Sequence, residues 1–73
     1  MARKQYHVSP ADNMWKVTHS GSTLSRHFAK SAAIAAGVTV ARNNQPSQLI
    51  IRRADGTIED ERTYGNDPFP PRG

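Results

Sequence analysis

The Asp55-Gly56 pair near the end of the chain constrains the fold more tightly than any other feature of the sequence. It follows residues 48–52, the most strand-like run in the chain, and it precedes a second run that begins at Ile58. Asp-Gly is typical of a two-residue type I′ turn, because both central residues of that turn need a positive φ. The sequence therefore predicts an antiparallel hairpin whose facing pairs are Arg53 with Ile58, Arg52 with Glu59, and Ile50 with Glu61.

A first hairpin is predicted near the N-terminus. Residues 5–8 and 14–19 alternate between polar and apolar side chains, as half-buried strands do. The Pro, Asp and Asn of residues 9–13 favour a turn between these two strands. Residues 20–25 are predicted to form a flexible connector, and residues 26–28 a short third strand that leads into a helix.

One helix is predicted over residues 30–44, which are rich in alanine, the best helix former. Its core-facing stripe consists of Ile34, Gly37, Val38 and Ala41, widened by Ala33, Ala36 and Val40. A glycine inside a helix costs about 1 kcal/mol relative to alanine. We therefore expect Gly37 to be compensated by close packing of the helix on the sheet.

These elements predict an α+β fold of order β-β-(β)-α-β-β, with one helix on one face of a small, mostly antiparallel sheet. Leu49, Ile51 and Ile58 are expected on the helix-covered face, while the other face stays open. Residues 1–66 would form the single domain, and residues 67–73 a proline-rich tail. We expect this tail to lie along a sheet edge, anchored by Phe69, or to be disordered.

An ordered set of short motifs covers nearly the whole chain: His7-Val8-x-Pro10, Trp15-x-Val17, the alanine-rich helix, Asp55-Gly56-x-Ile58 and Tyr64-Gly65-x-Asp67-Pro68-x-Pro70. This set resembles domain of unknown function 2188, a family of small bacterial and phage-borne proteins. The resemblance supports the α+β fold and implies no catalytic residues. The chain departs from the family at the start of the helix, where members show Thr-Lys or Ser-Lys and this sequence has Ala29-Lys30-Ser31.

Length and composition restrict the classes of function. A domain of 73 residues without cysteine is of marginal stability and holds no disulfide or thiolate metal site. We expect a cytoplasmic protein, because the N-terminus lacks the apolar run of a secretory signal. We also expect no cofactor, and no small-molecule substrate is evident from the sequence. No apolar run is long enough to span a bilayer, so no membrane association is expected.

The net charge of +4 is unevenly distributed along the chain. Residues 1–53 carry eight Lys or Arg and one acid, whereas residues 54–73 carry two Arg and five acids. A basic body of this kind attracts polyanions. We therefore predict a non-enzymatic module that binds DNA or RNA, with phosphate contacts from Lys16, Arg26, Lys30, Arg52 and Arg53.

The predicted contact surface is the open sheet face, with Tyr6 as a nearby stacking ring. Glu59 and Glu61 are expected on the same face, which argues against a phosphate site there. The alternative contacts would be Arg3, Lys4, Arg26 and Lys30. Trp15 pairs with Val17 at strand spacing and is expected in the core rather than against a base.

Two other functions stay open at this point. One is a protein-interaction module that forms a homodimer or holds a larger partner through an edge strand or the open face. The more remote one is a metal-independent RNA-cleaving enzyme, in which His7 and His19 would lie across from each other as general acid and base. The three histidines, which include His27, lack the spacing of metal ligands.

Overall fold

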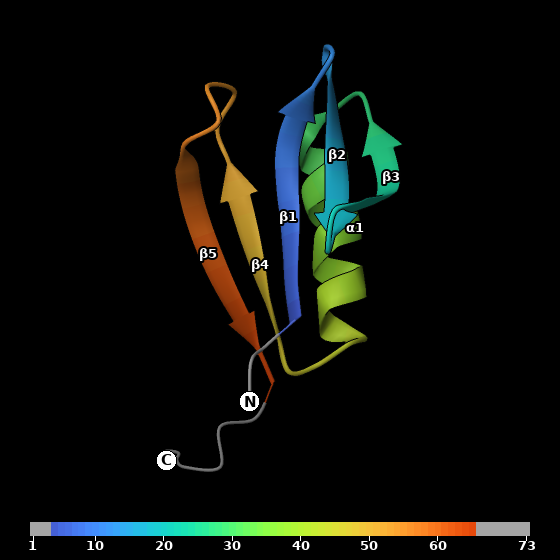
Figure 1. The fold of residues 1–73 in the computed structure, drawn as a ribbon, viewed down its shortest axis with the longest axis vertical. Coiled ribbons are helices and arrows are strands. Elements are labelled where there is room, and N and C mark those ends of the chain that lie inside the picture. Colours follow the sequence, from blue (N-terminus) through green and yellow to red (C-terminus); the bar gives the residue numbers. More distant parts are fainter. Residues whose placement is uncertain (1–3, 66–73) are drawn as a thin grey trace.

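The computed structural model describes residues 4–65, which form one five-stranded sheet and one helix. In chain order the elements are β1 (Lys4–Ala11), β2 (Met14–His19), β3 (Ser22–His27), α1 (Lys30–Arg42), β4 (Ser47–Arg52) and β5 (Ile58–Tyr64). The spatial order of the strands is β3-β2-β1-β4-β5. Figure 1 shows α1 lying across one face of this sheet, behind β1 and β2. The predicted α+β class is thus confirmed.

The sheet is mostly antiparallel, and its one parallel pair lies at the centre. There β1 runs alongside β4, with Tyr6 opposite Leu49 and Val8 opposite Ile51. A parallel pair needs a crossover connection, and here β2, β3 and α1 supply it. The parallel pair therefore joins the N-terminal strands to the C-terminal hairpin.

Two tight turns join the first three strands. Asp12 and Asn13 between β1 and β2 both have positive φ, at 50° and 66°, and so do Ser20 and Gly21 between β2 and β3, at 52° and 81°. Positive φ at both central residues is the type I′ pattern, which matches the twist of a hairpin. The prediction of a flexible connector over residues 20–25 was therefore wrong, because a two-residue turn leads directly into β3.

The helix begins at Lys30 and ends at Arg42, two residues before the predicted end. Its N-cap residue is Ala29, and no side chain caps the first turn. Burial follows the predicted stripe: Ala33, Gly37 and Ala41 are buried, while Thr39 on the opposite side is exposed. The alanine-rich sequence thus forms a regular helix although a polar N-cap is missing.

The core lies between α1 and the sheet. Its largest fully buried side chains are Val8, Val17, Leu49 and Ile51, joined by Tyr6, which is 4% exposed. Trp15 is partly buried and packs against this core, as predicted. Successive side chains on a strand point to opposite faces. Residues that alternate with these core positions therefore lie on the other face of the sheet, which no element among residues 4–65 covers; we call it the open face.

The C-terminal hairpin differs from its prediction in both turn and register. Arg53 N–H donates to the Thr57 carbonyl at 2.7 Å and Gly56 N–H to the Arg53 carbonyl at 2.9 Å, which closes a three-residue loop. Gly56 alone in this loop has positive φ, at 92°. This is the pattern of a type I turn followed by a left-handed glycine, instead of the predicted type I′ turn.

The register of this hairpin shifts by one residue near the loop. Ile50 faces Glu61 as predicted, but Arg52 faces Ile58, which leaves Glu59 as an extra, bulged residue on β5. Ile58 therefore shares the open face with Arg52 and is 45% exposed. The predictions that Ile58 faces the helix and that Arg52 faces Glu59 were both wrong, because the sequence pattern does not reveal the bulge. The predicted tail over residues 67–73 lies outside the described residues.

Candidate functional site

A row of basic side chains crosses the open face. Lys16 on β2 lies opposite Arg26 on β3 and, on its other side, opposite Ser9 on β1. The β1–β4 register pairs Val8 with Ile51, and so places Arg52 beside Ser9 in the same row. We call Arg26, Lys16 and Arg52 the basic row. From β3 to β4 it crosses three strand spacings, which is about 14 Å.

Within the described part of the chain, the side chains of Lys16 and Arg26 form no hydrogen bond or ion pair with another residue. Arg52 donates from Nη1 to the Gly56 carbonyl at 3.0 Å, which holds its guanidinium near the hairpin loop. A guanidinium has five N–H donors, so this one bond leaves most of them available. The basic row therefore presents three cations whose charge is not neutralised by an acid among residues 4–65.

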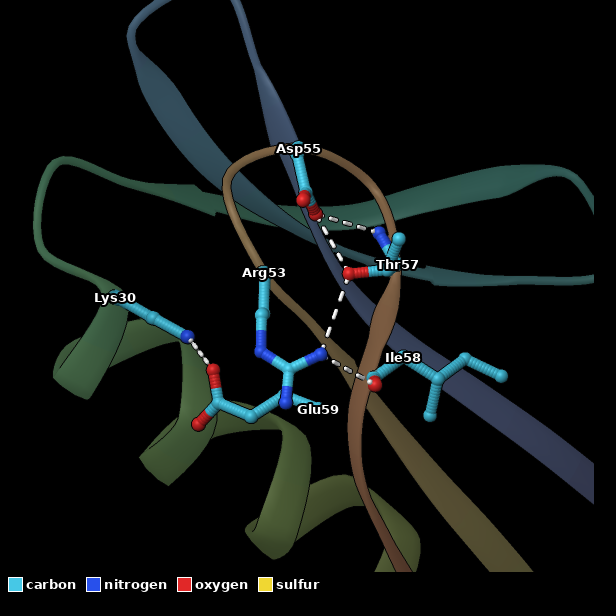
Figure 2. A network of polar contacts seen from close by, with 6 residues as sticks. All are labelled: Lys30, Arg53, Asp55, Thr57, Ile58 and Glu59. Carbon is cyan, nitrogen blue, oxygen red and sulfur yellow. Dashed lines mark hydrogen bonds and ion pairs between the residues drawn. The ribbon is translucent and has the colours of Figure 1, made fainter.

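The other two predicted contacts lie elsewhere. Lys30 forms an ion pair with Glu59, and its ammonium lies 5.1 Å from the centre of the Trp15 ring on the helix side of the sheet. Arg53 donates from Nη1 to the Ile58 carbonyl at 3.0 Å and to Thr57 Oγ1 at 3.3 Å. Figure 2 shows both cations at this hairpin, each directed at its partner. Three of the five predicted contacts are thus grouped together, and two belong to local structural pairs.

The two glutamates of β5 oppose a phosphate site on the open face less than the sequence suggested. Glu59 was expected on the open face, but as the bulged residue of β5 it turns towards α1 and pairs with Lys30 (Figure 2). Glu61 faces Ile50 and does lie on the open face, as predicted. It occupies the β5 edge of the sheet, in the row next to the basic row.

Tyr6 is not a stacking ring for a ligand. Its side chain is buried under α1, and its ring stacks on that of His19 with centroids 4.5 Å apart. The prediction of an exposed Tyr6 was therefore wrong. The alternation of residues 5–8 already contained the signal, because Tyr6 and Val8 have the same parity on β1 and must share a face.

A shallow depression of about 820 Å³ adjoins the basic row. It is lined by Lys4, Gln5, His7, Thr18, His19, Ser20, Gly21 and Gln48. Gln5 donates from Nε2 to Gln48 Oε1 at 3.4 Å, a long contact that leaves the rest of both amides available. The sequence analysis did not identify the two glutamines. Their positions on β1 and β4 alternate with those of the core residues, which indicates the open face but no function.

His7 lies at the centre of the open face, between Thr18 on β2 and Ile50 on β4. Partial burial, and secondarily the positive charge of Arg52, hold the pKa of the His7 imidazole below its ordinary value. The lowered pKa favours the neutral form of His7, which offers one N–H donor and one acceptor nitrogen.

The two histidines proposed as an acid–base pair do not face each other. His7 lies opposite Thr18, whereas His19 lies opposite Tyr6 on the helix-covered side. The His19 ring donates from Nδ1 to the Gln5 carbonyl at 2.9 Å. Both residues border the same depression, but the expected cross-strand arrangement was wrong, because neighbouring positions on a strand point to opposite faces.

Of the alternative cations, Lys4 borders the depression, and Arg3 lies outside the described residues. No group of three metal-ligating side chains occurs within residues 4–65. In the same range, α1 is too short and too polar to cross a membrane.

A family model described as "Uncharacterized protein conserved in bacteria (DUF2188)" matches residues 6–64, from the middle of β1 to the end of β5. No curated protein and no solved structure shows a significant match.

Proposed function

The chain belongs to the DUF2188 family of bacterial proteins, and from the charges on its surface we propose that it is a small nucleic-acid-binding module. The observation that carries this proposal is the basic row of Arg26, Lys16 and Arg52 on the open face. These residues come from three strands of one sheet, so the spacing of their backbone positions is fixed before any ligand binds. A fixed backbone lowers the conformational cost of contacting phosphates.

The charges around the row support the same proposal. Glu59 is turned away from the open face by the β5 bulge, and Ser9 in the middle of the row is a neutral hydrogen-bonding residue. Phosphate contacts of this type supply affinity without sequence preference, and that affinity falls steeply as salt rises. We therefore expect weak, salt-sensitive binding.

The experiment that tests the proposal is fluorescence anisotropy with labelled single-stranded DNA, duplex DNA and RNA, at roughly 50 and 200 mM salt. Lys16→Ala should weaken binding at low salt and reduce the slope of log K against log salt by about 0.7 to 0.9. Arg42→Ala is the matched control, because it removes the same charge from the exposed side of α1. No binding at low salt, or equal losses in the two variants, would refute the proposal.

A second candidate function is a protein-interaction module that uses the β3 edge. No strand among residues 4–65 pairs with the outer side of β3. Two exposed apolar side chains lie here, Leu24 on β3 at 48% and Phe28 just after β3 at 84%. The other edge, β5, carries Glu59, Asp60, Glu61 and Arg62, charges of the kind that discourage edge-to-edge pairing. Sedimentation of wild type and Leu24→Lys over a range of concentrations tests this candidate, and a strict monomer in both would exclude self-association.

A further inference from the structure

The depression beside the basic row has the composition of a site for a polar, flat ligand. Its hydrogen-bonding side chains include the amides of Gln5 and Gln48, the Thr18 hydroxyl and the His7 imidazole. Acids are absent from its lining, and Lys4 stands among the lining residues. Such a surface favours an uncharged polar ring attached to an anionic group over a cationic or purely apolar ligand.

The depression and the basic row are neighbours on the same strands. Thr18 follows Lys16 by two residues on β2, and His7 precedes Ser9 by two residues on β1. Two residues along a strand correspond to about 7 Å. A ligand that touches the basic row with its phosphates can therefore reach the depression with the ring attached to the adjoining sugar.

The shape of the open face distinguishes between types of nucleic acid. Proteins that read duplex DNA insert a helix or a two-stranded ribbon into the major groove. In the described part of this chain, the one helix lies on the opposite face, and no helix or hairpin crosses the open face (Figure 1). In a single strand the bases are free to turn outward, and proteins bind them by hydrogen bonds to their edges and by stacking on rings that include histidine.

We propose that the depression lined by Gln5, His7, Thr18 and Gln48 is a nucleobase-binding subsite, which makes this module selective for single-stranded nucleic acid. The inference rests on the proposed function, since the basic row must hold the phosphates. The amides of Gln5 and Gln48 contribute donors and acceptors to the edge of the base. His7 offers the one aromatic ring that the register of residues 4–65 places on the open face.

The test compares a single-stranded DNA oligonucleotide with an abasic strand of equal length, which keeps every phosphate and sugar but has no bases. A duplex of the same sequence is the third probe. We expect the normal strand to bind about threefold to tenfold more tightly than the abasic strand, the range for one or two hydrogen bonds. We expect the duplex to bind no more tightly than the abasic strand.

Thr18→Val should reduce this preference for a strand with bases and leave the salt dependence unchanged. Thr23→Val is the matched control, because Thr23 is the β3 partner of Thr18 in the same row but does not line the depression. Gln48→Ala provides a second variant in the depression. Circular dichroism of each variant checks that it is folded.

The possible failures are distinguishable. If the normal and abasic strands bind equally well with strong salt dependence, the base subsite is refuted and the phosphate-binding function stands. Duplex binding that exceeds single-strand binding refutes the subsite in the same way. If no probe binds at low salt, the proposed function itself fails and the subsite fails with it.

Discussion

A Cβ atom placed on Gly37 would lie 2.9 Å from Cδ1 of Leu49 and 3.1 Å from Cγ2 of Val8. The helix therefore approaches the central β1–β4 pair as closely as a glycine allows. This finding confirms the predicted reason for a glycine within an otherwise alanine-rich helix.

Gly37→Ala should destabilise the protein. Overpacking a tight core costs about 1 to 3 kcal/mol, and the better helix propensity of alanine returns only about 1 kcal/mol. Urea denaturation followed by Trp15 fluorescence measures the difference. Combining Gly37→Ala with Leu49→Val should recover part of the loss, since valine is one carbon shorter than leucine. A single variant that is more stable than wild type would show that Leu49 and Val8 move aside without cost.

Ser47→Ala should lower the free energy of unfolding by about 0.5 to 1.5 kcal/mol, the range for one hydrogen bond. The Ser47 side chain is fully buried, and its hydroxyl donates to the Ala41 carbonyl at 2.6 Å near the end of α1. Alanine fits the same space but removes this bond, and the carbonyl keeps the Asn44 N–H donor at 3.2 Å. Ser22→Ala, at an exposed position on β3, is the matched control and should change stability little. Equal effects in the two variants would contradict the role given to the buried hydroxyl.

Stability should fall as the pH drops below the ordinary pKa of histidine. Because the pKa of His7 is lowered in the folded state, the unfolded chain binds a proton at a pH where the folded protein still does not. The contribution of neutral His7 to the free energy of unfolding is complete above about pH 6.5. It is lost as the pH falls towards the pKa of His7 in the folded state. His7→Gln should flatten the pH dependence in that window, as measured by urea unfolding.

The pKa of His7 can also be followed directly by an NMR titration of its ring protons. Arg52→Ala should move the pKa upward, because the Arg52 charge is one of the two causes of its depression. Arg42→Ala, on the far side of the molecule, should leave the pKa of His7 unchanged. A wild-type value at or above that of an unperturbed histidine would contradict the proposed burial of the ring.

The Lys30–Glu59 pair should contribute no more than about 1 kcal/mol, the range for partly exposed ion pairs. The exposed fractions of its side chains are 28% for Lys30 and 41% for Glu59. A double-mutant cycle with Lys30→Met and Glu59→Gln isolates the coupling energy. A value several times larger would mean that the Trp15 ring and the helix screen the pair from water more completely than these exposed fractions indicate.

The sequence was most informative where burial alone decides the structure. The periodicity of α1 predicted which residues face the sheet, because a helix of alanines and branched side chains has one apolar side. The same reasoning failed for Ile58 and Glu59. A single bulged residue reverses the sheet face to which each residue between the bulge and the loop points. Neither the composition nor the alternation of the sequence reveals such a bulge.

The arrangement of the candidate site could likewise be predicted only in part from the sequence. Lys16 and Arg52 were placed on the open face from their parity, but their arrangement in one row with Arg26 depends on the β1–β4 register. That register joins segments far apart in the chain, and no local pattern specifies it. The Gln5 and Gln48 pair was not predicted for the same reason, since each residue alone resembles an ordinary surface amide.

The parallel pairing at the centre of the sheet also determines where the two ends of the fold lie. Lys4 is opposite Ser47, and Ser47 is opposite Tyr64, so the first residue of β1 and the last of β5 stand in one row. They are separated by two strand spacings, roughly 10 Å. A short linker could therefore connect them, and new termini could be opened at the Ser20-Gly21 turn. Because its two ends are close together, the fold can also be inserted into a surface loop of a host protein without stretching either junction.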